Sequence, residues 1–225
     1  MKGADLSAWQ GAAAPGRVVL EGRYARLEPL DSARHESDLF QAATAPGAED
    51  RFRYLPDTAP ADHAAFHAWM TASAVSTDPL FFAVIDKATG LAGGRQALMH
   101  IVPPHGTVEF GHVFWGPAIA RTRVATEALY LSAQYIFEEL GYRRFEWKCN
   151  TRNEPSRRAA LRFGFRFEGI FRNHMVVKGQ NRDTAWFAIT DSDWLALKAG
   201  YRAWLTPENF DDSGQQKSPL AVTTV

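Results

Sequence analysis

One acidic side chain lies where its surroundings favour proton transfer. Glu109 is in a strongly β-prone run of Val, Phe and Trp residues (107–115), between a valine and a phenylalanine. Partial burial among such neighbours raises the pKa of a carboxyl group and makes it a better base near neutral pH. A strand carboxylate that pairs with a nearby arginine is the alternative interpretation. Glu109 is therefore a candidate base.

The segment after this run has the order strand, loop, helix. The loop covers 116–122, and the helix predicted after it (123–140) carries its apolar residues in two adjacent stripes. Such a junction presents unpaired backbone N–H groups and the positive end of a helix, and both attract anions. An ordinary crossover loop is the alternative, because every α/β protein has junctions of this kind.

Positive charge is concentrated after this helix, although the formal net charge of the chain is zero. The window 143–166 has two acidic residues and eight basic ones, a local charge of +6. The basic residues are Arg143, Arg144, Lys148, Arg152, Arg157, Arg158, Arg162 and Arg166. A local cluster on a neutral protein favours a small polyphosphate ligand over a nucleic-acid duplex, which would need a basic face across the domain. Arginines that only solvate a helix face are the alternative.

Cysteine and histidine residues give little indication of nucleophilic or metal chemistry. The single cysteine, Cys149, excludes a disulfide framework and a cysteine-based metal site, and indicates a reducing compartment. His63 and His67 have i, i+4 spacing but lack the glutamate of a zinc-protease motif. We therefore expect Cys149 to be structural, and we predict no metal site.

The elements that position these residues follow from periodicity and turn residues. A hairpin or a strand is expected at 17–27, and strands are expected at 80–85, 91–102, 107–115, 143–149, 165–177 and 182–190. Helices are expected at 29–43, 61–74, 123–140, 155–163 and 191–205. Because helices alternate with several strands, we expect a mixed α/β fold.

Composition indicates one globular domain in this chain of 225 residues. Hydrophobic residues make up 46% and charged residues 22%, which excludes a disordered or fibrous chain. We expect an N-terminal arm at 1–16, the domain at 17–205 and a C-terminal polar tail at 206–225. No apolar run approaches the roughly 18 residues of a membrane span, and the arm lacks the apolar core of a secretory signal. A cytoplasmic protein without membrane or nucleic-acid partners is expected.

Five segments follow one another along the chain: VEFGHVFWGP (108–117), RTRVATEA (121–128), LGYRRFEWK (140–148), NTRNEPSRRAALRFGFRFEG (150–169) and KGQNRDT (178–184). Together they resemble a GNAT-family N-acetyltransferase. The branch that they resemble most is the RimJ/RimL-type, which acetylates protein N-terminal amines, amino-acid-like amines or amine toxins. The resemblance covers most of the chain, from about Val19 to Thr190. It implies a mixed, splayed central sheet of about seven strands with about four flanking helices, plus a C-terminal helix.

The resemblance implies acetyl-coenzyme A (acetyl-CoA) as donor and co-substrate, with no metal. The pyrophosphate would lie on the amides of residues 120–126, the same anion site that the strand–loop–helix order indicates. The pantetheine arm would bind the strand backbone near 113–115 and the side chain of Asn153. The implied donor-binding residues are Val113, Phe114, Trp115, Ala120, Arg121, Thr122, Arg123, Val124, Ala125, Thr126, Asn153 and Ser156.

One position departs from the family pattern. The phosphate loop of the family usually reads Gln/Arg-x-x-Gly-x-Gly/Ala, and Arg123 occupies the place of the first glycine. Because Arg123 has a Cβ atom, its backbone is expected to keep a negative φ. Arg121 and Arg123 would supply positive charge in compensation.

The resemblance also implies three catalytic candidates. Glu109 matches a position that often activates the amine, directly or through water. Ser156 would lie near the thiol sulfur as a donor to the leaving thiolate. Glu168 is a second candidate base, because that position faces the acceptor pocket in some relatives.

The implied function is direct acetyl transfer to a primary amine. Near pH 7.4, deprotonation costs roughly 1 kcal/mol for an α-amine and roughly 4 kcal/mol for a lysine amine, so one carboxylate suits an α-amine better. The expected acceptor is a protein or peptide N-terminal α-amine or an amino-acid-like amine. The alternatives are a detoxifying enzyme for small amines or antibiotics, and a non-catalytic acyl-CoA-binding sensor or interaction module. Family members often dimerise, so the resemblance is compatible with a homodimer.

Overall fold

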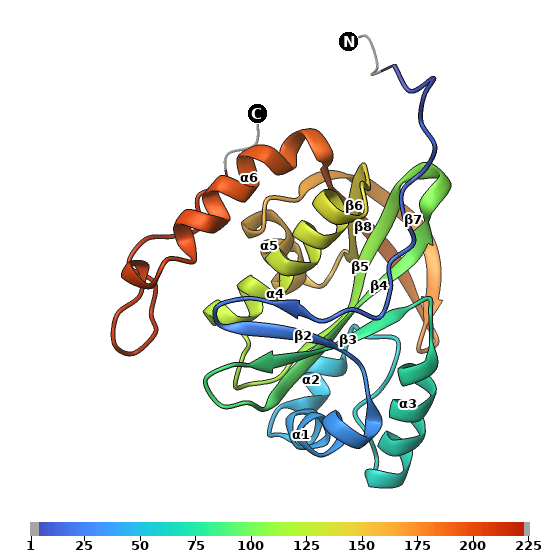
Figure 1. The fold of residues 1–225 in the computed structure, drawn as a ribbon. Coiled ribbons are helices and arrows are strands. Elements are labelled where there is room, and N and C mark those ends of the chain that lie inside the picture. The colour runs from blue at the N-terminus through green and yellow to red at the C-terminus, as the bar shows by residue number, and fades with distance from the viewer. Residues whose placement is uncertain (1–4, 223–225) are drawn as a thin grey trace.

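An eight-stranded sheet forms the centre of the computed structural model, which describes residues 5–222 (Figure 1). Its strand order is β1-β2-β3-β4-β5-β6-β8-β7, and all neighbours are antiparallel except β5 and β6. The strands are β1 (Leu20–Glu21), β2 (Ala25–Pro29), β3 (Leu80–Asp86), β4 (Ala92–Val102), β5 (Thr107–Trp115), β6 (Arg144–Asn150), β7 (Arg166–Val177) and β8 (Gln180–Thr190).

Helices cover both faces of the sheet, and most of them begin at a polar capping residue. Asp31, Asp62, Thr122 and Asn153 each accept a hydrogen bond from a backbone N–H of the first turn that follows. The α-helices in the described part of the chain are α1 (Ser32–Thr44), α2 (Ala48–Phe52), α3 (His63–Val75), α4 (Arg123–Gln134), α5 (Glu154–Arg162) and α6 (Asp191–Trp204).

The sheet is buried on both sides at β3, whose residues from Leu80 to Ile85 are apolar without interruption. Phe82 and its same-face neighbours pack in one core cluster with α4, α5 and α6. Phe81 and Ala83 point the other way and pack in a second cluster with α1, α2 and α3. Adjacent residues of one strand therefore belong to two different cores, as the two-residue period of a strand requires.

The mixed α/β fold predicted from the sequence is confirmed, with one more strand and one more helix than expected. Of the two alternatives for the segment 17–27, the structure shows the hairpin, formed by β1 and β2, and α2 is an additional short helix. The long predicted helix 123–140 is α4 followed by a π-helical turn at Tyr135–Glu139. No helix within residues 5–222 is long and apolar enough to cross a membrane.

Both terminal segments, in the range that the structure describes, pack on the domain. In the predicted N-terminal arm, the Gly16 N–H donates to the Tyr135 hydroxyl at 2.9 Å. In the predicted polar tail, Phe210 and Leu220 are buried, and Trp204 Nε1 donates to Gln216 Oε1 at 3.0 Å. A polar tail was expected because the composition of this segment is polar overall. The structure differs because Phe210 and Leu220 are buried beside α6.

Parallel pairing between β5 and β6 is short. It runs from the Thr107–Arg144 pair to the Glu109–Glu146 pair and then ends. Beyond that point β5 stays with β4 and bulges, with His112 at a φ of 49°, while β6 continues along β8. Buried Arg95 holds the bulge by donating from Nη1 to the His112 carbonyl oxygen at 2.9 Å. The two central strands therefore diverge.

A buried carboxylate fixes the position of α4 against the edge of the sheet. Glu127, which is 4% exposed, accepts backbone hydrogen bonds from three consecutive residues at 2.9, 2.5 and 2.6 Å. These donors are Arg23 and Tyr24, in the turn between β1 and β2, and Ala25, the first residue of β2. An anionic acceptor satisfies these donors better than a neutral one, because hydrogen bonds to charged groups are stronger.

We expect Glu127→Gln to destabilise the protein by about 2–3 kcal/mol, because the amide replaces one acceptor oxygen by a donor that faces the same N–H groups. The midpoint of thermal unfolding should fall by roughly 4–10 °C, which calorimetry would measure. Glu139→Gln is the matched control, since Glu139 is exposed on the π-helical turn after α4. Equal midpoints for the two variants would contradict this role of Glu127.

Candidate active site

A cavity of about 1700 Å³ opens where β5 and β6 diverge. It has walls on both faces of the sheet. On one face it is lined by residues 120–126 at the start of α4 and by α5, and on the other by side chains of β7 and β8. Because the gap passes between the two central strands, groups bound on opposite faces can meet there.

All of the predicted donor-binding residues line this cavity. The backbone N–H groups of Arg121, Arg123 and Ala125 have no acceptor in the part of the chain that the structure describes. Thr122 caps α4 by accepting from the Val124 N–H at 3.2 Å. Unpaired amides at the positive end of a helix form a site suited to an anion.

The two arginines of this loop have different conformations. Arg123 is the first residue of α4, and the left-handed conformation of the loop belongs to Arg121, with a φ of 63°. The expectation that Arg123 avoids positive φ is thus confirmed. Its guanidinium lies 4.4 Å from the ring centre of Tyr24 and 5.2 Å from that of Phe210. Arg123 therefore joins the start of α4 to β1–β2 and to the C-terminal segment.

Asn153 and Ser156 lie together at the start of α5. Asn153 Oδ1 accepts from the Ser156 N–H at 3.2 Å, and Ser156 Oγ accepts from Trp147 Nε1 at 2.9 Å. Burial raises the pKa of the Cys149 thiol, while a hydrogen bond with Ser156 acts in the opposite direction. A thiol with a raised pKa is a poor nucleophile near neutral pH, which agrees with a structural role for Cys149.

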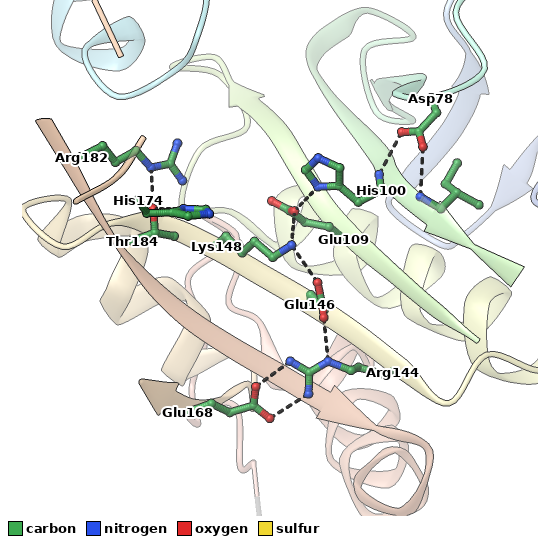
Figure 2. Close-up of polar contacts among 11 residues, drawn as sticks. Asp78, His100, Glu109, Arg144, Glu146, Lys148, Glu168, His174, Arg182 and Thr184 are labelled. Carbon is green, nitrogen blue, oxygen red and sulfur yellow. Dashed lines mark hydrogen bonds and ion pairs between the residues drawn. The ribbon is translucent and has the colours of Figure 1, made fainter. Parts of the chain in front are cut away.

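Glu109 is buried and lies in a chain of charged groups on the opposite face (Figure 2). Its Oε2 atom is 2.7 Å from His100 Nδ1 and 2.9 Å from Lys148 Nζ. The hydrogen bond with Glu109 raises the pKa of His100, although partial burial acts against it. Oε1 has no hydrogen-bond partner within residues 5–222 and is not enclosed. This carboxylate is bound by His100 and Lys148 through one oxygen, and its other oxygen remains free.

Glu168 lies at the far end of the same chain of charges. Lys148 also contacts Glu146 at 2.9 Å, and Arg144 connects Glu146 to Glu168 with two hydrogen bonds of 2.8 and 2.6 Å to the latter. Burial acts to raise the pKa of Glu146, but the hydrogen bonds from Arg144 and Lys148 lower it overall. Glu168 is exposed and is not among the residues that line the cavity.

Several residues of the cavity were not predicted as site residues from the sequence. Arg182 and Trp186 of β8, and His174 of β7, line it on the Glu109 side. Residues 213–216 and Phe210 of the C-terminal segment line it near α4. Because side chains alternate along a strand, the sequence could have placed residues 182, 184 and 186 on one face of β8. The strand order that brings β8 beside β6 could not be predicted in this way.

The described residues show no evident site for a metal ion. Among residues 5–222, no group of three or more His, Cys, Asp or Glu side chains is arranged to hold a metal ion. His112 is half-buried at the cavity wall, and burial lowers its pKa, with Arg95 adding to the effect. Its ring is therefore neutral near neutral pH, and Nδ1 is buried without a partner in the described chain.

A family model described as the acetyltransferase (GNAT) domain matches residues 26–166, more than half of the chain. The chain belongs to the GNAT acetyltransferase family. The matched range of this GNAT protein begins in β2, ends at the first residue of β7, and includes both strands that diverge and the start of α4. The family predicted from five sequence segments is thereby confirmed.

Solved structures agree with this assignment. A GCN5-related N-acetyltransferase from Brucella melitensis is 58% identical, with a TM-score of 0.94, over 96% of this chain and 97% of that one. A GNAT-family protein from Chromobacterium violaceum is 39% identical, with a TM-score of 0.80, over 87% of this chain and 98% of that one. The curated relative is the uncharacterized N-acetyltransferase YnaD of Bacillus subtilis, 31% identical over 88 residues. The match covers 39% of this chain and spans about half (51%) of that relative.

We expect Glu109→Gln to return the pKa of His100 toward its ordinary value of about 6.5, because the neutral amide no longer favours the protonated ring. Titration of the ring protons by NMR would measure it. In the unaltered protein, His100 contributes stability that is complete below about pH 6.5 and is lost as the pH rises through the raised pKa. Glu168→Gln is the control and should leave the titration unchanged. An unchanged pKa in Glu109→Gln would show that this carboxylate does not set the His100 pKa.

Proposed function

We propose that this GNAT protein transfers the acetyl group of acetyl-CoA directly to a primary amine. The observation that carries the proposal is the cavity between β5 and β6, with unpaired amides at the start of α4 on one face and Glu109 on the other. Transfer forms a bond between the amine nitrogen and the acetyl carbon and breaks the carbon–sulfur bond. The amine loses a proton and the thiolate gains one.

The residues around α4 fit a donor with several phosphates. The N–H groups of Arg121, Arg123 and Ala125 point to an anion site, and Arg162 borders the same cavity. Arg162 has no carboxylate within ion-pairing distance among the described residues, and its Nη1 donates to Thr126 Oγ1 at 3.2 Å. A cation without an acidic partner beside free amides favours a phosphate ligand. The pantetheine arm would then follow β5 near Val113 toward Asn153.

Glu109 is the group that we propose as the base. His100 and Lys148 bind Oε2, while Oε1 remains free to accept a proton from the acceptor ammonium. Of the two candidates considered from the sequence, Glu168 has both oxygens bound by Arg144 and lies outside the cavity lining. We therefore assign the role to Glu109 alone.

Ser156 lies on the other side of the gap and is the proposed donor to the leaving thiolate. Its oxygen already accepts from Trp147 Nε1, which fixes the position of the hydroxyl group and leaves its hydrogen to donate. Backbone N–H groups on the open edge of β5 would stabilise the oxyanion. Direct transfer follows, since burial raises the pKa of the Cys149 thiol and makes it a poor nucleophile.

The acceptor that we propose is an α-amine, of a peptide, a protein or an amino acid, in keeping with the RimJ/RimL-type resemblance. One carboxylate can deprotonate an α-amine at a lower cost than a lysine amine. A detoxifying enzyme would use the same machinery on a different amine. A non-catalytic acyl-CoA-binding module would bind the donor but would not use Glu109, so activity of the Glu109 variant separates it from an enzyme.

We expect Glu109→Gln to reduce kcat by about 10²–10⁴-fold, because the proton acceptor is lost. Thiol release with an amine substrate would measure the rate, and calorimetry should show unchanged binding of acetyl-CoA. Glu168→Gln is the control and should retain kcat within about twofold. A larger loss in Glu168→Gln than in Glu109→Gln would reverse the assignment of the base.

We expect Arg162→Gln to weaken acetyl-CoA binding by about tenfold or more, because hydrogen bonds to a charged phosphate contribute roughly 1.5–3 kcal/mol. Calorimetric titration with acetyl-CoA would measure the Kd. Arg158→Gln is the matched control, since Arg158 is exposed on the same helix and does not line the cavity. Equal Kd values for both variants would contradict a role of Arg162 in phosphate binding. If acetyl-CoA does not bind to the unaltered protein at millimolar concentration, the proposed function is wrong.

A further inference from the structure

Arg182 is a half-buried cation of the cavity that has no acidic partner. Within residues 5–222, no carboxylate lies at ion-pairing distance from its guanidinium. Its Nε donates to Thr184 Oγ1 at 3.2 Å, and His174 Nδ1 is 3.0 Å from the same hydroxyl oxygen (Figure 2). Thr184 is fully buried, so this contact fixes the guanidinium while both Nη atoms remain free.

Strand register places Arg182 on the same face as the proposed base. Glu109 is paired with Glu146 across β5 and β6, and Lys148 is paired with Trp186 across β6 and β8. Because paired residues share a face, and residues two apart along a strand do too, Glu109 and Arg182 border the same side of the gap. The proposed thiolate donor, Ser156, contacts Trp147, which points to the opposite face. Arg182 therefore belongs to the acceptor side.

The carboxylates of this side form their ion pairs with other cations and not with Arg182. Lys148 is neutralised by two carboxylates, Glu109 and Glu146, at 2.9 Å each. Burial lowers the pKa of Arg182, and the field of Glu109 acts against this, which shows that the two groups share one electrostatic environment. Arg182 therefore has no contacting carboxylate, and an anionic ligand could pair with its guanidinium.

A second donor near Arg182 also has no acceptor. Trp186 Nε1 is buried without a hydrogen-bond partner in the described chain, and Trp186 lines the cavity. Its ring is held by Lys148, whose Nζ lies 4.0 Å from the ring centre, and by Phe171, whose ring centre is 4.6 Å away. The indole N–H is itself enclosed by protein, so Trp186 contributes its ring to the cavity wall and not a donor to a ligand.

We infer that the acceptor carries a carboxylate group, which binds Arg182 while its amine lies at Glu109. This inference rests on the proposed function and specifies its substrate class. The two free Nη atoms can donate to both oxygens of a carboxylate. An acceptor that carries both an amine and a carboxylate offers one group to Glu109 and the other to Arg182. Free α-amino acids have this chemistry, and so do peptides whose first residue is aspartate or glutamate.

The test compares acceptors that differ only in the carboxylate. Thiol release from acetyl-CoA is measured with the full chain and three sets of acceptors: free L-amino acids, their amides or decarboxylated amines, and peptide amides that begin with aspartate or glutamate. We expect the carboxylate-bearing acceptors to be acetylated preferentially. The first and third sets identify which source of the carboxylate the site uses.

Arg182→Gln tests the residue itself. We expect the KM for the preferred carboxylate acceptor to rise by about 10- to 100-fold, with the KM for its decarboxylated amine and the Kd for acetyl-CoA unchanged. Arg182→Lys should recover part of the loss, because it keeps the charge but not the planar pair of donors. Arg172→Gln is the matched control, since Arg172 is exposed on β7 and does not line the cavity. A thermal melt verifies that each variant is folded.

The outcomes separate this inference from the proposed function. If acetyl-CoA binds but amides and decarboxylated amines are acetylated as fast as the acids, the inference is wrong and the function stands. The same holds if Arg182→Gln weakens acetyl-CoA binding instead, because Arg182 would then serve the donor. If acetyl-CoA does not bind at all, both are wrong.

Discussion

The architecture of the site depends on one constraint, the end of parallel pairing after Glu109 and Glu146. Up to that pair, β5 and β6 share hydrogen bonds as any two neighbouring strands do. Beyond it each strand follows its other neighbour, β4 or β8, and the sheet remains continuous without closing the gap. A bulge at His112, held by the buried Arg95, maintains this divergence. An opening through a sheet is stable here because neither strand loses its second partner.

The same opening separates two sets of charged and polar groups, one on each face of the sheet. One face offers unpaired backbone amides and Arg162 for a polyanion. The other face holds a line of alternating charges, from His100 through Glu109 and Lys148 to Glu146 (Figure 2). Such a network is costly to bury unless its members satisfy one another, and they do so here. Arg182 differs because its guanidinium is only partly satisfied, and this makes it informative about the ligand.

Local patterns were sufficient to predict most elements and the donor loop. Alternation in 144–149 predicts a half-covered strand, and the strand–loop–helix order at 107–126 is local in sequence, so both could be derived without knowledge of the fold. Arg182 and Trp186 could not be assigned to the site in this way, because their role depends on the placement of β8 between β6 and β7. The contact of Phe210 with Arg123 depends on long-range packing as well. Glu168 is the opposite case, a residue that the sequence motif suggested as a base. Its ion pair with Arg144 is visible only in the tertiary structure.

The stack of Tyr24, Arg123 and Phe210 has a consequence for the order of folding events. It joins three segments that are each close to ninety or more residues apart along the chain, and contacts of such separation form late because loop closure costs entropy. The start of α4, where the donor is proposed to bind, is completed by this stack. Competence to bind a ligand there should therefore appear after the sheet and its two cores have formed. During refolding, recovery of ligand binding would then mark the last step. Recovery of the helical signal would mark an earlier step.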